Sequence, residues 1–181
     1  MNVITVSVRL FLLQKLPFSA FSFPHWQSVA AITLRAAMLV ALAILQYQPD
    51  DRIFIPYWFM VLQGPILVWA LFLTSFVFLR WWMKRKGRWD GQGDLFNLMA
   101  ASWLSPSVLS LILALVGAPL SIITLLSFYS MWVEASALSA AVPRASFRYC
   151  MGGIILSALI LHIPWSMVAR ASIAVLKVIQ P

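Results

Sequence analysis

Residues 95–142 read LFNLMAASWLSPSVLSLILALV, then GAP, then LSIITLLSFYSMWVEASALSAAV. Each apolar stretch has about the 20 residues that a helix needs to cross some 30 Å of hydrocarbon. Neither stretch alternates with the period of two that is typical of a barrel strand, so both are predicted to be helices. The link Gly117-Ala118-Pro119 is too short for an exposed loop, which predicts a tight helical hairpin.

Three more stretches of similar length lie on either side of this hairpin, at about residues 28–47, 57–79 and 149–168. Over all 181 residues, 62% are hydrophobic and only 10% are charged. A water-soluble domain needs many more polar residues to cover its surface, so that class is excluded. We predict an all-α integral membrane bundle of five transmembrane helices over residues 26–171, with an N-terminal segment 1–25 and a tail 172–181.

The N-terminal segment leaves two structures open. Leu10, Phe11 and Leu13 stand beside Arg9 and Lys15, which suits a short helix lying in the membrane interface. A disordered tail with a few membrane-seeking side chains fits the same residues. No cleavage pattern follows, so we expect the segment to stay in the mature protein.

The 13 Lys and Arg residues outnumber the 5 Asp and Glu residues and give a net charge of +8. Nine of the 13 lie in segment 1–25, between the second and third spans, and between the fourth and fifth. Arg170 and Lys177 of the last span and tail argue against the orientation that these nine indicate. Positive residues concentrate in cytoplasmic loops, so we predict a cytoplasmic N-terminus and an outer C-terminus, in a bacterial inner membrane. Because these cations lie between apolar blocks, nucleic acid is not an expected partner.

The basic segment after the second span is predicted to contact anionic lipid, which contributes about 1 kcal/mol per cation at the membrane surface. Its candidate lipid contacts are Lys84, Arg85, Lys86 and Arg88. The turn at Gly91 and Gly93 then precedes Asp94, which is predicted to cap the next helix.

Three ionisable residues fall inside predicted spans: Arg35, Glu134 and His162. Such groups cost about 2.5–3.5 kcal/mol at the bilayer centre on insertion scales, and they are functional candidates by default. Arg35 and Glu134 are expected at the same depth, which favours an interhelical ion pair. Separate snorkelling toward the headgroups and a proton or substrate relay are the alternatives. His162 precedes Pro164 and is expected to bond a freed carbonyl rather than to ligate heme.

Small residues at four-residue spacing in the last two spans let helix backbones approach closely and predict the centre of the bundle or of an interface there. The candidate packing residues are Ser136, Ala140, Gly152, Gly153 and Ser157. In the second span, wide rings predict a surface that faces lipid or a partner; they are Trp69, Phe72, Phe76 and Phe78.

No catalytic or cofactor-binding residues are expected. The serines of residues 102–110 have no Gly-x-Ser-x-Gly turn around them, which disfavours a serine hydrolase. With one cysteine, Cys150, and two histidines, the chain has no ligand set for a structural zinc ion.

The basic segment, the Gly91-x-Gly93 turn, the span opening LFNLMAASWL at residues 95–104, and Trp132-Val133-Glu134 in the following span occur in this order. Together they resemble bacterial members of the Yip (Ypt-interacting protein) domain family over residues 24–171. The resemblance implies five spans with the N-terminus inside and the C-terminus outside. Eukaryotic members of that family are trafficking factors that engage prenylated Rab GTPases, and the bacterial members have no agreed activity.

Two functions follow as expectations. The first is a non-catalytic scaffold, assembly factor or accessory subunit that acts through helix–helix contacts, with membrane lipids and other integral membrane proteins as partners. The alternative is a small transporter or channel-like protein that uses Arg35 and Glu134. A Glu134 sealed among side chains, without a cavity, would exclude the alternative.

Overall fold

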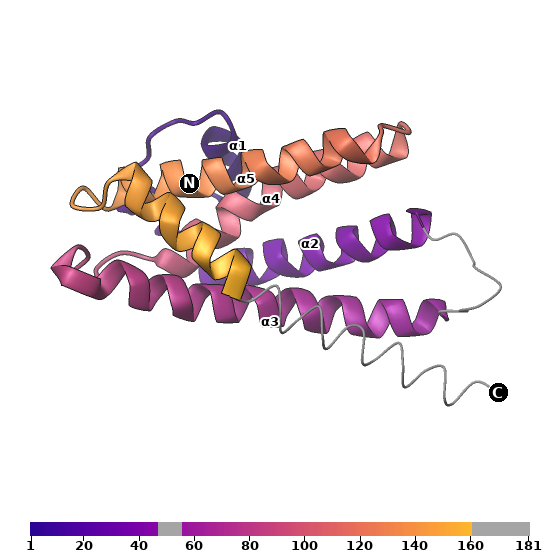
Figure 1. Cartoon of the computed structure of the whole chain (residues 1–181), viewed down its shortest axis with the longest axis horizontal. Helices are drawn as coiled ribbons and strands as arrows, with labels where there is room; N and C mark the ends of the chain where they lie inside the picture. The colour runs from indigo at the N-terminus through magenta and orange to yellow at the C-terminus, as the bar shows by residue number, and fades with distance from the viewer. Residues whose placement is uncertain (47–55, 161–181) are drawn as a thin grey trace.

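The structure is a computed structural model that describes residues 1–46 and 56–160, and this part of the chain is all-helical. Figure 1 shows the long helices side by side along the longest axis. The elements are α1 (Val3–Phe11), η1 (Phe18–Phe21), α2 (His25–Gln46), α3 (Tyr57–Lys84), η2 (Arg85–Gly87), α4 (Leu95–Leu115), α5 (Leu120–Ala141) and a last, unlabelled helix (Phe147–Ile160).

Four helices, α2 to α5, are long and apolar enough to cross a membrane, which confirms that four of the predicted spans are helices of the required length and composition. α2 begins at His25 rather than at residue 28, and α3 continues to Lys84 rather than ending at residue 79. The fifth predicted span, 149–168, corresponds in part to the last helix, and residues 161–168 lie outside the described residues.

α4 lies at the centre of the described bundle, since it packs against α1, α2 and α5. The prediction that the last two spans form the centre of the bundle or of an interface stays a prediction, because residues 161–168 of the fifth span lie outside the described residues. The predicted hairpin of α4 and α5 is confirmed, and Gly117 adopts φ +76° in its link, a backbone conformation that suits glycine.

Phe72 of α3 is fully buried, which corrects its predicted exposure to lipid or a partner. Its ring meets Phe96 and Trp103 of α4 edge-to-face, with both pairs of centroids 5.1 Å apart. Such pairs contribute about 0.5–1.5 kcal/mol each beyond their buried area. This aromatic cluster holds α3 against α4.

The N-terminal segment is folded onto the bundle, so the disordered alternative is wrong. α1 buries Val3, Val6, Ser7 and Leu10, which follow helical spacing, against α4 and α5. Ser7 Oγ lies 2.6 Å from Ser105 Oγ and also accepts a hydrogen bond from the Ser105 N–H at 2.9 Å. Polar contacts therefore attach α1 to α4 beside the proline at position 106.

A buried amide, Asn97, holds residues 21–28 against the start of α4. Its Nδ2 donates to the carbonyls of Phe21 and Phe23 at 2.8 and 2.7 Å, and its Oδ1 accepts from Ser28 Oγ at 2.6 Å. Asp94 caps α4 as predicted, because its carboxylate accepts from the Asn97 N–H at 2.9 Å.

The last helix packs against the end of α3 through two reciprocal hydrogen bonds. Tyr149 Oη donates to the Trp82 carbonyl at 2.6 Å, and Trp82 Nε1 donates to the Tyr149 carbonyl at 3.2 Å. A Cβ on Gly153 would lie 2.5 Å from the Trp82 ring, so only glycine fits there. Gly152 is exposed and a Cβ there would meet nothing within 4 Å, while Ser136 and Ala140 are half-buried on α5.

Candidate functional site

Arg35 of α2 and Glu134 of α5 both contact the indole of Trp103 of α4, Arg35 at the ring face and Glu134 at the ring N–H. The Arg35 guanidinium carbon lies 4.2 Å from the centroid of the Trp103 ring, and its Nη1 donates to the Trp103 carbonyl at 3.4 Å. Trp103 Nε1 donates to Glu134 Oε2 at 2.9 Å. The structure thus brings the two predicted residues together through an indole rather than in a direct ion pair.

The contact of Arg35 with the Trp103 ring and the hydrogen bond from Trp103 to Glu134 are both favourable in a low-dielectric environment. A cation over an indole face gains about 2 kcal/mol or more when it is desolvated. A hydrogen bond to an ionised group contributes about 1.5–3 kcal/mol in proteins. Trp103 therefore gives one partner to each charge at once, to the cation through its face and to the carboxylate through its edge.

These contacts still leave three buried polar atoms without a hydrogen-bond partner among the described residues: Arg35 Nε, Glu134 Oε1 and Ser157 Oγ. Glu134 and Ser157 are only 5% and 3% exposed. Buried polar groups are nearly always satisfied, and each orphan costs about 1–3 kcal/mol. Three such atoms in one place indicate a partner other than the described side chains.

All three residues line one cavity of about 160 Å³. This volume has room for several waters or for one small solute. The polar wall consists of Arg35, Ser75, Trp103, Ser130, Glu134 and Ser157, which come from α2, α3, α4, α5 and the last helix.

The residues that line the cavity lie at similar distances from one end of the bundle. α2, α4 and the last helix begin at the same end of the molecule at which α3 and α5 finish (Figure 1). At a rise of 1.5 Å per residue, Arg35, Trp103, Glu134 and Ser157 lie about 10–15 Å from that end. A helix crossing about 30 Å of hydrocarbon has its middle at this depth.

The wall determines which chemistry the cavity suits. Arg35 Nε–H can only donate, an ionised Glu134 Oε1 can only accept, and the Ser157 hydroxyl can do either. A ligand that carries an acceptor and a donor a few ångströms apart satisfies all three. Water, a small amide and a small zwitterion meet this requirement.

Three of the four residues predicted to contact lipid lie against aromatic rings at the basic end of the bundle. Lys84 Nζ is 5.9 Å from the centroid of Trp89, and the Arg85 guanidinium is 4.7 Å from that of Trp81. The Arg88 guanidinium carbon lies closer to its ring, at 3.8 Å from the centroid of Tyr149. The Lys86 side chain and the whole of His162 are outside the described residues.

Sequence reasoning missed the roles of Trp103 and Asn97. Trp103 is one tryptophan among nine, and the sequence places it at mid-span like any lipid-facing ring. Asn97 carried a signal, because an amide in an apolar span needs buried partners. Ser157 was predicted only as a packing residue.

Comparisons of the chain with family models, with curated proteins and with solved structures find no match. The resemblance to the Yip domain family stays a prediction.

Proposed function

We propose that this chain is a polytopic membrane protein that binds a small polar solute in the cavity around Trp103, as a small transporter or channel-like protein. The observation that carries the proposal is the cavity with three unpartnered buried polar atoms, on Arg35, Glu134 and Ser157. Glu134 is not sealed among side chains, since it lines this cavity. The alternative expected from the sequence is therefore the one that the geometry supports best.

The proposal includes a topology. The last helix continues as a fifth span, the N-terminus is cytoplasmic, and the membrane is a bacterial inner membrane. The charge distribution supports this arrangement, because Arg80, Lys84, Arg88, Arg144 and Arg148 flank spans at a single end. The Yip-like order of motifs implies the same number of spans.

Purified protein in liposomes tests the function directly. The probes are protons, followed with an internal pH dye, and urea and glycine, followed by light scattering after an osmotic jump. We expect flux above that of protein-free liposomes for at least one probe, and loss of this flux in Glu134→Gln and Arg35→Gln. The matched control is Thr124→Val, which changes an exposed residue of α5 far along the helix from the cavity. Flux equal to that of empty liposomes for all three probes would overturn the proposal.

The scaffold or accessory subunit stays a second candidate because of the position of α3. Within the described chain, α3 packs mainly against α2, and large apolar residues along it are exposed, among them Trp58, Ile66 and Val77. A partner helix fits such a surface as well as lipid does. Native purification in a mild detergent separates the two cases, because a protein recovered alone and monomeric does not act as a subunit.

A further inference from the structure

A second pocket, of about 410 Å³, opens at the basic end of the bundle and shares no residue with the cavity around Trp103. Its walls are the loop after η2 and the link between α5 and the last helix. Two arginines from these separate segments, Arg88 and Arg144, line it together. The other side chains in its wall that the argument uses are Phe18, Trp89, Asp90 and Gln92.

Arg88 is held in place by an aromatic stack. Its guanidinium carbon lies 3.8 Å from the centroid of the Tyr149 ring, whose other face stacks on Trp82 with centroids 5.1 Å apart and 21° between the planes. The two reciprocal hydrogen bonds between Tyr149 and Trp82 fix that ring. A cation that is oriented before binding loses less entropy when a ligand arrives.

Both arginines keep their hydrogen-bond donors available. No carboxylate of the described residues lies within 4.0 Å of either guanidinium; the ion pair in this part of the chain joins His25 to Asp94, which lie outside the pocket wall. Asp90, the acidic residue in the pocket wall, accepts from the Gln92 N–H at 2.8 Å. The two cations and one acid leave the wall with a net positive charge.

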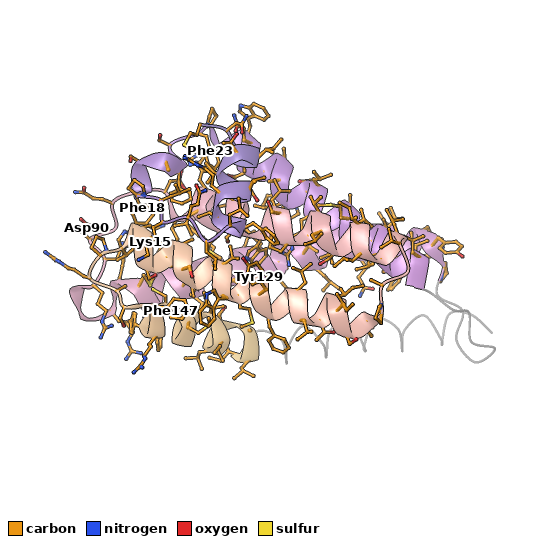
Figure 2. The ribbon with its side chains drawn as sticks, turned by 90° about the horizontal axis from the view of Figure 1, so that it is seen from above. Lys15, Phe18, Phe23, Asp90, Tyr129 and Phe147 are labelled. Carbon is orange, nitrogen blue, oxygen red and sulfur yellow. The ribbon has the colours of Figure 1, made fainter. Side chains whose placement is uncertain are left out.

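The loop that carries Arg88 also makes contacts with its own backbone and with η1. Trp89 Nε1 donates to the Gln92 carbonyl at 2.7 Å, and the Trp89 ring stacks on Phe18, with centroids 6.0 Å apart. Gly93 adopts φ +88°, and Phe18 occupies the space where a Cβ would lie. Figure 2 shows Phe18, Asp90 and Lys15 together at this end of the bundle.

We propose that this pocket binds the phosphate of an anionic phospholipid headgroup between Arg88 and Arg144. Guanidinium groups suit phosphate because their planar N–H pairs can bind two oxygens at once. The half-exposed ring of Trp81 marks the same end of α3 as a membrane interface, the level at which lipid presents its phosphate. The sequence predicts a diffuse basic surface here, whereas the structure singles out two arginines, one of them outside that basic segment.

Native mass spectrometry of the full chain in detergent, titrated with phosphatidylglycerol, tests the proposal. We expect Arg144→Gln and Arg88→Gln each to weaken retention of the lipid about tenfold, the loss expected for one charge-assisted bidentate contact. The matched control is Arg148→Gln, an exposed arginine at the same end that does not line the pocket, and its effect should stay below about twofold. Arg144 is exposed, so its replacement does not threaten folding.

Two further arms separate the proposal from its rivals. Arg88→Lys keeps the charge but loses the planar stack on Tyr149, so it should also weaken retention; wild-type retention would overturn the pocket geometry. Equal losses in Arg144→Gln and Arg148→Gln would replace the pocket by a diffuse charged surface. Displacement of the lipid by millimolar inorganic phosphate would assign the pocket to a soluble anion and overturn the lipid assignment.

Discussion

Replacing Trp103 by Phe removes the Nε1–H that donates to Glu134 Oε2 and keeps an aromatic face beneath Arg35. The carboxylate of Glu134 then has no side-chain donor for either oxygen, because its Oε1 already lacks one. A net hydrogen bond to a charge is about 1.5–3 kcal/mol in soluble proteins, and interhelical bonds in membranes reach about 1.7 kcal/mol. We therefore expect Trp103→Phe to lower the free energy of unfolding by about 1–2 kcal/mol through this bond.

The Glu134→Met background isolates that bond from the smaller volume of phenylalanine. In this background Trp103 has already lost its acceptor, so Trp103→Phe removes an orphaned donor instead of creating an orphaned acceptor. The packing loss is common to both backgrounds and cancels in a double-mutant cycle. We expect a coupling of about 1–2 kcal/mol between the two positions, so that Trp103→Phe costs less in the Glu134→Met protein than in the wild type.

Reversible unfolding in mixed detergent micelles, with SDS as the denaturant, measures all four proteins of the cycle. Retention of the helical circular dichroism signal before the transition shows that each variant is folded. Additivity within about 0.5 kcal/mol would refute the reasoning, because independent sites behave in that way. It would mean that Glu134 finds its partner elsewhere and that Trp103 only fills space.

Three other outcomes are expected. Asn97→Ala removes the bonds that hold residues 21–28, so it should lower the free energy of unfolding by about 2–4 kcal/mol and speed proteolysis before α2; protease resistance equal to wild type would count against this. Ser7→Cys combined with Ser105→Cys should form a disulfide under mild oxidation, measured by mass, whereas an undocked α1 would leave both thiols free. Gly153→Ala forces a methyl group against the Trp82 indole and should lower the free energy of unfolding by about 1–3 kcal/mol in the same micelle assay. The control Gly152→Ala meets nothing within 4 Å and should be neutral or stabilising, so equal effects of the two substitutions would contradict the packing.

Four of the five predicted spans could be located from hydropathy, because a helix that crosses lipid needs a minimum apolar length and satisfies its own backbone hydrogen bonds. The exact limits could not, since α2 begins at His25 and α3 continues to Lys84. The link at Gly117 and the cap at Asp94 were predictable as well. Glycine and aspartate act there on the local backbone, and their effects need no knowledge of distant residues.

The faces of the helices could not be predicted in the same way. α3 and α4 carry apolar side chains on all faces, so no periodic stripe indicates which face is buried. The sequence therefore predicts that Phe72 faces lipid or a partner, although it packs inside against Phe96. By contrast, α1 has a readable stripe at Val3, Val6, Ser7 and Leu10, and the error there came from centring the helix on later residues.

At the candidate site too, the residues could be identified from the sequence, whereas their contacts could not. Arg35 and Glu134 could be found from their cost in a membrane and from their shared depth. Their indirect contact could not, because an indole between two charges depends on the rotation of α4 about its axis. Ser157 joins them for the same reason, since a serine at a packing position and one that faces a cavity look alike in sequence.

The contact between Ser7 and Ser105 has a consequence for biosynthesis. The two residues are 98 positions apart, so α1 leaves the ribosome long before its binding surface on α4 exists. At about 5–20 residues per second, roughly 5–20 s separate their synthesis. During this interval the apolar stripe of α1 must rest on the membrane surface or on an insertion factor. Docking of α1 is thus a late step, because it needs the α4–α5 hairpin to be in place. A bulky fusion at the N-terminus would delay this docking rather than membrane insertion.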